Sequence, residues 1–353
     1  CYMNEVRRKC VGIIFGGQSN EHAISIESAK AIFAALNSDI NKKKFSTKVF
    51  YINRNGKWFD SKDSLLILKH SKDIDNFIAN SLFENIKIFE NIDCKDIDIW
   101  FPIIHGANGE DGSIQGLLKF TQKPFVGSGL LGSALGMDKI IMKLIFSHLK
   151  IPQVNFFIIQ DKNLDDDNNL KIISDQIIKK LNFPLFVKPA NSGSSIGISK
   201  VINQYDILNA LRKAWSIDHR IIVEEGLDVK ELEVGVIGKK NLIASEVGEV
   251  NYISDWYDYD SKYKTNNKIT IPANVDPILK EKIQTLSIQS CMALNINIFA
   301  RVDFFLEKDT NKIYLNEINT IPGFTKNSMF PLLWKSSGLE IDELVAKIIE
   351  YSL

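Results

Sequence analysis

The sequence predicts a mixed α/β protein built from three units, the first with an open parallel sheet and the other two of α+β type. Three observations support this fold class. Short apolar runs alternate with helical patterns and glycine turns in the first third of the chain. The pattern changes near the glycine-rich segment 127–138, after which strands become more frequent. The chain has 353 residues, and ~100–200 residues per domain suits two or three domains.

Composition narrows the class of function. Lys+Arg and Asp+Glu both number 43, so the formal net charge is zero, whereas a nucleic-acid-binding protein normally carries a basic excess. No apolar run approaches the ~18–20 residues needed to cross a bilayer, and no signal peptide is recognised behind the charged N-terminus. The four cysteines are scattered, which is typical of a reduced compartment. We therefore expect a cytoplasmic protein with no nucleic-acid or membrane partner.

In the first unit we expect strands at 11–15, 46–52 and 96–104, with a helix after the first strand. Glu21 lies at that helix start, and His105 follows the third strand. Open α/β sheets bind ligands at the carboxyl ends of their strands, so both residues are candidates. FGGQS lacks the G-x-G-x-x-G spacing, which disfavours a dinucleotide site, and a lone histidine is more often structural.

The second unit begins with a helix over 138–150. Its apolar side is expected to carry Ile141, Leu144, Ile145 and Leu149. Strands are expected at 154–159, 185–188, 197–201 and 221–225. The Gly/Ser-rich loop 191–197 follows the strand with Phe186 and Lys188 on one face. Backbone N–H groups of such a loop can bind phosphate oxygens while a lysine adds positive charge, and a plain turn is the alternative.

The third unit contains two strands, ARVDFF and YLNEIN, with polar residues at every second position. Arg301, Asp303 and Phe305 share one face, and Glu317 and Asn319 share another. If the strands pair, these groups converge into a set of oxygen ligands that suits Mg²⁺. An exposed strand face with ordinary ion pairs is the alternative.

A charged segment, IIVEEGLDVKELEV, joins the second and third units. Glu224, Glu225 and Leu227 lie where a strand runs into a linker, a place where backbone groups can bind an adenine edge. Glu231 could accept hydrogen bonds from ribose hydroxyls. ELEVGVIG itself alternates like a half-exposed strand. A charged hinge without a ligand explains this segment equally well.

Taken together, these segments resemble the D-alanine–D-alanine ligases, a family with the ATP-grasp fold. They follow the family order as GGQSNEHAIS, HGANGEDGSIQG, GSALGMDK, FVKPANSGSSIG, VEEGLDVKELEV, YDYDSKY, ARVDFF and NEINTIPGFTKNSMFP. The resemblance implies three domains, with ATP held between two sheets of the central and C-terminal domains. We place these domains at 1–127, 128–228 and 229–353, with a mobile ω-loop at 249–270.

The resemblance also implies roles for individual residues. ATP would be bound by Lys139, Phe186, Lys188, Glu224, Glu225, Leu227, Glu231, Lys262 and Phe305. Lys139 and Lys188 match the two phosphate-binding lysines, and Lys262 reaches the γ-phosphate from the ω-loop. Two Mg²⁺ ions, or Mn²⁺ in their place, would be bound by Asp303, Glu317 and Asn319. Activation by K⁺ is left open.

On the substrate side, Glu21, Ser194 and Tyr263 match a hydrogen-bonded trio that joins the ω-loop to the other domains. Arg301 and the backbone N–H of Gly323 match an oxyanion hole. Glu21 would bind the first substrate's ammonium, and Ser328 with the Met329 N–H would bind the second carboxylate. His105 either orients the first substrate or accepts a proton.

The expected reaction is ATP-dependent ligation of two D-alanine molecules through D-alanyl phosphate, for peptidoglycan precursor synthesis. Its substrates are small molecules, and the family leads us to expect a homodimer. A related ligase making D-alanyl-D-lactate or D-alanyl-D-serine is the alternative, and so is a non-catalytic nucleotide-binding regulator. Tyr263 in YDYDSKY favours an amine as the second substrate.

Overall fold

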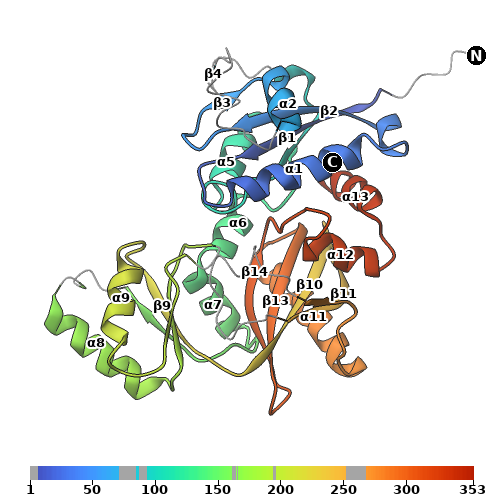
Figure 1. The fold of residues 1–353 in the computed structure, drawn as a ribbon. Coiled ribbons are helices and arrows are strands. Elements are labelled where there is room, and N and C mark those ends of the chain that lie inside the picture. The colour runs from blue at the N-terminus through green and yellow to red at the C-terminus, as the bar shows by residue number, and fades with distance from the viewer. Residues whose placement is uncertain are drawn as a thin grey trace, which may run out of the picture.

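The computed structural model describes residues 7–70, 85–86, 94–160, 164, 166–193, 196–251 and 268–353. Three sheets follow one another along the chain (Figure 1). Among the residues that the structure describes, no helix is long and apolar enough to span a bilayer.

The first sheet has the strand order β4-β3-β2-β1-β5. Its strands are β1 (Lys9–Gly16), β2 (Phe45–Ile52), β3 (Trp58–Phe59), β4 (Asn85–Ile86) and β5 (Ile99–Pro102). Strand β1 pairs in parallel with β2 and β5, whereas β3 and β4 add an antiparallel edge. The predicted parallel sheet therefore holds for β2, β1 and β5, and the complete sheet is mixed. Helices α1 (His22–Leu36), α2 (Ser61–Lys69) and α5 (Ser113–Lys119) belong to this part of the chain.

The second sheet is antiparallel, with the order β6-β9-β7-β8. Its strands are β6 (Phe156–Ile159), β7 (Leu185–Pro189), β8 (Ser199–Val201) and β9 (Ile221–Glu225). Helices α8 (Asp167–Lys180) and α9 (Ile207–Trp215) share its hydrophobic core through residues such as Leu170, Ile177 and Leu211.

The third sheet has the order β12-β11-β10-β13-β14, and its neighbouring strands are antiparallel. Its strands are β10 (Val229–Gly238), β11 (Ile243–Asn251), β12 (Lys268–Thr270), β13 (Ile298–Glu307) and β14 (Ile313–Asn319). The helices of this unit are α11 (Pro277–Ala293), α12 (Met329–Ser336) and α13 (Ile341–Ser352). Asp276 caps α11 by accepting a hydrogen bond from the Ile278 N–H at 2.9 Å, and Pro277 occupies the first turn as expected.

The C-terminal helix returns to the first unit. Leu344, Val345 and Ile348 of α13 are buried in the same core as Val11 of β1 and Ile32 of α1. Figure 1 shows α13 beside α1, with the C-terminus close to the first sheet. Hydrophobic burial therefore couples the first and third units, although the predicted domain boundaries themselves stay a prediction.

Two predictions about the third unit are wrong. The strand β10, predicted to be half exposed, is buried throughout residues 232–238. One side contributes Leu232 and Val234 to a hydrophobic core, and α12 also packs against the strand. The predicted ω-loop is also too wide at both ends, because 249–251 belong to β11 and 268–270 belong to β12.

The apolar side predicted for the helix after 138 is confirmed at Ile145, which packs against the core of the third sheet, but is wrong at Leu144 and Leu149. Helices α6 (Leu130–Met137) and α7 (Lys139–His148) precede the second sheet. In α7 the side chains of Leu144 and Leu149, its C-cap, are 46% and 50% exposed, whereas Met142 and Phe146 are fully buried. Met142 and Phe146 pack in the core of the third sheet. Lys139 and Lys143 lie on this buried side, and their charged side chains make that side resemble a solvent-exposed one in the sequence pattern.

Candidate active site

A cleft of about 1470 Å³ is lined by residues of the second and third sheets and by loops of the first unit. Every predicted site residue that the structure describes lines it. They are Glu21, His105, Lys139, Phe186, Lys188, Glu224, Glu225, Leu227, Glu231, Arg301, Asp303, Phe305, Glu317, Asn319, Gly323, Ser328 and Met329. Ser194, Lys262 and Tyr263 lie outside the described residues.

One wall of the cleft is built by β13 and β14, which pair antiparallel as the period-two pattern predicts. Arg301 lies opposite Asn319, and Asp303 lies opposite Glu317. The register shifts directly after Asp303, so one extra residue of β14 separates Glu317 from Leu315. Such a bulge bends a strand and changes the direction of the side chains beside it.

Arg301 contacts two carboxylates on this wall. Its Nε and Nη2 donate to the two Asp303 oxygens at 2.7 Å each, a bidentate contact. Its Nε also lies 2.8 Å from Glu233 Oε2, across the sheet on β10. Asn319 Nδ2 donates to Asp303 Oδ2 at 2.9 Å. The guanidinium is therefore held at the carboxylates from which a metal site would be built.

The donor set on this wall fits Mg²⁺. No group of three or more His, Cys, Asp or Glu side chains within the described ranges is spaced to hold a metal by itself. Asp303 and Glu317 nevertheless face each other across paired strands, with the Asn319 amide beside them. Mg²⁺ typically takes one or two carboxylates and completes its shell with phosphate oxygens and water. This wall would therefore need a phosphate ligand to complete such a site.

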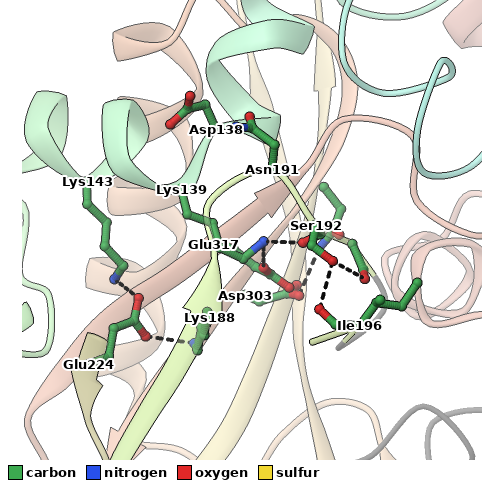
Figure 2. A network of polar contacts seen from close by, with 12 residues as sticks. Asp138, Lys139, Lys143, Lys188, Asn191, Ser192, Ile196, Glu224, Asp303 and Glu317 are labelled. Atoms are coloured by element: carbon green, nitrogen blue, oxygen red, sulfur yellow. Dashed lines mark hydrogen bonds and ion pairs between the residues drawn. The ribbon is translucent and has the colours of Figure 1, made fainter. Parts of the chain in front are cut away.

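The opposite wall is basic and comes from α7, β7 and β9. Figure 2 shows Lys139, Lys143 and Lys188 around Glu224 and the loop at Ser192. Lys139 Nζ donates to the Ser192 backbone oxygen at 2.8 Å and lies 3.5 Å from Glu317 Oε2 on the acidic wall. Lys188 Nζ donates to Glu224 Oε2 at 2.7 Å. The two predicted phosphate-binding lysines thus reach one cleft from different elements.

Charge pairing in this buried cluster shifts its pKa values. Burial opposes ionisation of Glu224, but Lys143 and Lys188 outweigh it and lower the pKa of the carboxyl to about 2. Burial likewise disfavours the charge of Lys188, but Glu224 outweighs it, so the pKa of Lys188 is raised. Burial lowers the pKa of Lys143 despite the nearby Glu224.

The hinge between the second and third sheets lines the cleft with Glu224, Glu225, Gly226 and Leu227. The Glu225 side chain is directed elsewhere, because it accepts hydrogen bonds from Asn155 Nδ2 at 2.8 Å and from the Asn182 N–H at 2.7 Å. A Cβ atom at Gly226 would lie 2.7 Å from Phe186 Cε2. Phe186 therefore leaves room for glycine alone at this point of the hinge.

Glu21 connects the first unit to the Gly/Ser-rich loop. A Cβ atom on Gly106 would lie 2.7 Å from Glu21 Oε2, and one on Gly193 would lie 3.5 Å away. Gly106 has φ +73°, which glycine adopts without strain. The Glu21 carboxylate thus lies between the loop after β5 and the loop after β7.

His105 is buried, with an exposed fraction of 3%. Its Nδ1 lies 2.9 Å from the Ile321 backbone oxygen, and its Nε2 lies 3.1 Å from Ser28 Oγ. Ser28 Oγ also accepts a hydrogen bond from the Phe324 N–H at 3.0 Å. Because the Ile321 oxygen can only accept, Nδ1 carries a proton. His105 and Ser28 together hold the loop that carries Gly323.

A carboxyl whose side chain is only 15% exposed accompanies this histidine. Glu110 Oε1 lies 3.8 Å from His105 Nδ1. Burial raises the pKa of Glu110 to about 7, and the nearby Glu21 carboxylate adds to the increase while His105 opposes it. Burial also disfavours the charge of His105, but Glu110 and Glu21 outweigh it and the pKa of His105 is raised.

The loop after β14 leads into α12. A Cβ atom on Gly323 would lie 3.0 Å from Ser328 Oγ, so the predicted oxyanion residue and the predicted carboxylate residue are neighbours. Ser328 Oγ accepts a hydrogen bond from the Thr325 N–H at 3.1 Å. Ser328 is the N-cap of α12, and Met329 is its first residue. The first N–H groups of a helix have no intrahelical partner and favour anions.

Four residues of this region were not predicted from the sequence: Ser28, Glu110, Lys143 and Glu233. Two of them follow from spacing alone. Lys143 is one helical turn after Lys139, and Glu233 alternates with Glu231 along β10. Glu110 belongs to the quoted segment HGANGEDGSIQG but bears no distinguishing pattern. A serine inside an amphipathic helix gives no signal that it is buried and bonded to a distant loop.

Known proteins match over nearly the whole chain. The family model described as D-ala D-ala ligase N-terminus matches residues 10–128, and the one described as D-ala D-ala ligase C-terminus matches residues 145–350. A D-alanine--D-alanine ligase of Prochlorococcus marinus strain MIT 9312 is 60% identical, covering 99% of each chain. The ligase of the same name from strain MIT 9515 is 61% identical, covering 98% of each.

Solved structures agree with this relationship. The VanG D-Ala:D-Ser ligase from Enterococcus faecalis superimposes with a TM-score of 0.84 at 31% identity, covering 98% of this chain and 100% of the other. The D-alanine-D-alanine ligase from Coxiella burnetii gives 0.82 at 29% identity, covering 98% and 94%.

The three sheets and the cleft between the last two are those of an ATP-dependent ligase with the ATP-grasp fold. Within that class, the chain belongs to the D-alanine–D-alanine ligase family.

Proposed function

We propose that this chain joins two D-alanine molecules to D-alanyl-D-alanine, converting ATP to ADP and phosphate, for peptidoglycan precursor synthesis. The observation that carries the proposal is the pairing of β13 with β14, which brings Arg301, Asp303, Glu317 and Asn319 together opposite Lys139 and Lys188. The relatives at about 60% identity, which carry the D-alanine--D-alanine ligase name, support the choice of substrates.

The first step in this proposal activates the carboxylate. An oxygen of the first D-alanine attacks the γ-phosphorus of ATP, the bond to the bridging oxygen breaks, and ADP leaves with that electron pair. Such transfers depend mainly on positioning and on charge neutralisation. Lys139 and Lys188 would bind the phosphates, and Glu21 would hold the substrate ammonium. Lys262 and Tyr263 would act from the ω-loop, on the resemblance alone.

The nucleotide would lie across the hinge. The backbone of Glu224, Glu225 and Leu227 would bind the adenine edge, while Glu231 would bind the ribose. Phe186 and Phe305, which line the cleft from opposite sheets, would form the apolar walls of the adenine pocket. Because the Glu225 N–H donates to the Asn155 backbone oxygen and its side chain bonds Asn155 and Asn182, its backbone carbonyl would be the adenine contact of this residue.

In the second step the amine of another D-alanine attacks the acyl carbon, and phosphate leaves after the tetrahedral oxyanion collapses. Arg301 and the Gly323 N–H would stabilise that oxyanion. Ser328 and the Met329 N–H would bind the carboxylate of the incoming D-alanine. The tie from His105 and Ser28 to the Gly323 loop favours orientation over proton transfer as the role of His105.

Two Mg²⁺ ions, or Mn²⁺, would be bound by Asp303, Glu317 and Asn319 and would neutralise charge on the ATP phosphates.

The proposal also includes the domain boundaries at 127/128 and 228/229, a cytoplasmic location and a homodimer. Sedimentation of the purified chain at several concentrations tests the homodimer.

The test of the function is ADP release by the purified chain with ATP, Mg²⁺ and D-alanine, followed by mass analysis of the product. We expect ADP release only when D-alanine is present, with a dipeptide of two alanines as the product. ATP binding without D-alanine-dependent turnover would instead identify a nucleotide-binding regulator.

A second product is favoured by one finding, the similarity to a solved D-Ala:D-Ser ligase. The assay therefore includes D-serine and D-lactate as competitors of the second D-alanine. If a mixed product with D-serine or D-lactate forms preferentially, that competitor is the second substrate and D-alanine is not.

A further inference from the structure

Lys143 is a buried cation that the proposed reaction does not use. It lies on α7 one turn after Lys139, and its side chain is 1% exposed. It is absent from the lining of the cleft, whereas Lys139, Lys188 and Glu224 all line it. Burying an ammonium group without compensation is costly, so its surroundings must supply charge.

Glu224 supplies that charge and shares it with a second lysine. Lys143 Nζ lies 3.2 Å from Glu224 Oε1, while Lys188 Nζ donates to Glu224 Oε2 at 2.7 Å. Figure 2 shows the Glu224 carboxylate between the two ammonium groups, with Lys143 on the side away from Lys188. The Glu224 side chain is 3% exposed, so water does little to screen either contact.

Lys143 and Lys188 approach different oxygens of the Glu224 carboxylate, so one negative charge is shared between two lysine side chains. Without Lys143, the Glu224 carboxylate would neutralise Lys188 one to one. With Lys143 present, each lysine is only partly neutralised.

We propose that Lys143 is a positioning residue for the nucleotide: by taking part of the Glu224 charge, it leaves Lys188 able to bind ATP phosphates. The inference rests on the proposed function, since it assumes that a nucleotide occupies the cleft. Lys143 acts through Glu224 and does not touch the ligand. The ring of Phe156, with its centroid 5.7 Å from Lys143 Nζ, adds a second favourable contact for the buried cation.

The test substitutes Lys143→Met, which keeps the length and apolar stem of the side chain but removes its charge. We expect the KM for ATP to rise about tenfold, a typical effect of weakening one charged contact. The KM for D-alanine and the kcat at saturating ATP should stay within about twofold of the wild type. Titration with ADP and Mg²⁺ in the absence of D-alanine should show the same loss of affinity.

The decisive variant is the double substitution Lys143→Met with Glu224→Gln. Removing the Glu224 charge releases Lys188, so ATP affinity should recover to within about threefold of the wild type. Phe146→Leu is the matched control, because Phe146 is fully buried on the same helix but packs in the core of the third sheet. It should lower thermal stability without changing the KM for ATP.

An unchanged KM for ATP in Lys143→Met overturns the inference, as does a double variant no better than the single one. If Lys143→Met does not fold, Lys143→Gln provides the same comparison with a polar side chain. The ADP titration separates the two proposals. A wild-type chain that binds no ADP contradicts the proposed function, whereas equal binding by wild type and Lys143→Met contradicts this inference alone.

Discussion

The two walls of the cleft handle charge in opposite ways. The wall from α7, β7 and β9 places Lys143 and Lys188 on either side of the Glu224 carboxylate, with Lys139 beside Ser192. The wall from β10, β13 and β14 instead surrounds the single guanidinium of Arg301 with carboxylates, including Glu233 and Asp303. On each wall one charged group, Glu224 or Arg301, contacts two neighbours of the opposite charge.

The difference has a chemical meaning for a ligase that uses ATP. Lysines favour phosphate oxygens, while carboxylates favour the metal ions that accompany those phosphates. Lys139 spans the two walls, because its ammonium group reaches Ser192 on one side and Glu317 on the other. Opposite walls can therefore bind opposite charges of one metal–nucleotide complex.

The largest effect is expected on the acidic wall. Arg301→Ala removes the guanidinium that would stabilise the oxyanion, so kcat should fall by ~10²–10³. The measurement is steady-state ADP release at saturating substrates, together with thermal unfolding of the variant. Turnover near that of the wild type would remove Arg301 from this role.

On the basic wall, Glu224→Gln should change the pH dependence of stability. The Glu224 pKa of about 2 lies below its ordinary 4.5 and corresponds to roughly 3 kcal/mol of stabilisation. Because the folded pKa is lowered, that stabilisation is present above pH 4.5 and is lost as the pH falls toward 2. Denaturant unfolding from pH 6 to about 2.5 should therefore show a flatter decline for Glu224→Gln than for the wild type.

The matched control for that experiment is Glu281→Gln on α11, where the glutamate is exposed. Its decline with falling pH should parallel that of the wild type. A Glu224→Gln profile that also parallels the wild type would show that the buried cluster does not depend on ionised Glu224.

A smaller effect on kcat is expected from Ser28 of the first unit, which contacts the loop that follows β14 of the acidic wall. Ser28→Ala removes the hydroxyl that joins His105 to the Phe324 N–H, so the Gly323 loop should lose its alignment. We expect kcat to fall about tenfold and ADP affinity to change by less than about twofold. A small displacement of the Gly323 N–H lowers the rate of the chemical step more than it weakens nucleotide binding.

Ser25→Ala is the control, since Ser25 is also buried on α1 but bonds the Ile103 backbone oxygen and the Gly16 N–H instead. It should reduce stability while leaving kcat nearly unchanged. Equal kcat losses in the two serine variants would contradict the proposed tie between His105, Ser28 and the Gly323 loop.

The smallest effect concerns the exposed side of α7, the helix that contributes Lys139 to the basic wall. Leu144→Ala should change the free energy of unfolding by less than about 0.5 kcal/mol, because surface substitutions of this kind have small effects. Denaturant unfolding measures this directly. A loss above about 2 kcal/mol would show that Leu144 is on the buried side of the helix, as the sequence pattern predicted.

The acidic wall was predictable from the sequence and the basic wall was only partly so. Residues 301–305 and 317–319 alternate with period two, and such alternation determines which side chains share a strand face. On α7 the same reasoning failed, because Lys139 and Lys143 occupy the buried side and make it look solvent-exposed. Burial of a paired charge has no periodic signature.

Other features depend on contacts between distant segments. Ser28 and Phe324 are 296 residues apart, and only the folded chain brings them together. The spacing within HGANGEDG likewise does not indicate that Glu110 would lie beside His105. Segment order was enough to assign the family resemblance, whereas these supporting contacts required the structure.

The central claim is that the carboxylate of D-alanine becomes phosphorylated, and isotope transfer tests it most directly. D-alanine labelled with ¹⁸O in its carboxylate is incubated with the chain, ATP and Mg²⁺, and the released phosphate is analysed by mass. Attack of the carboxylate on the γ-phosphorus predicts one ¹⁸O atom in each phosphate formed with dipeptide. Release of unlabelled phosphate alongside dipeptide would contradict the acyl phosphate route.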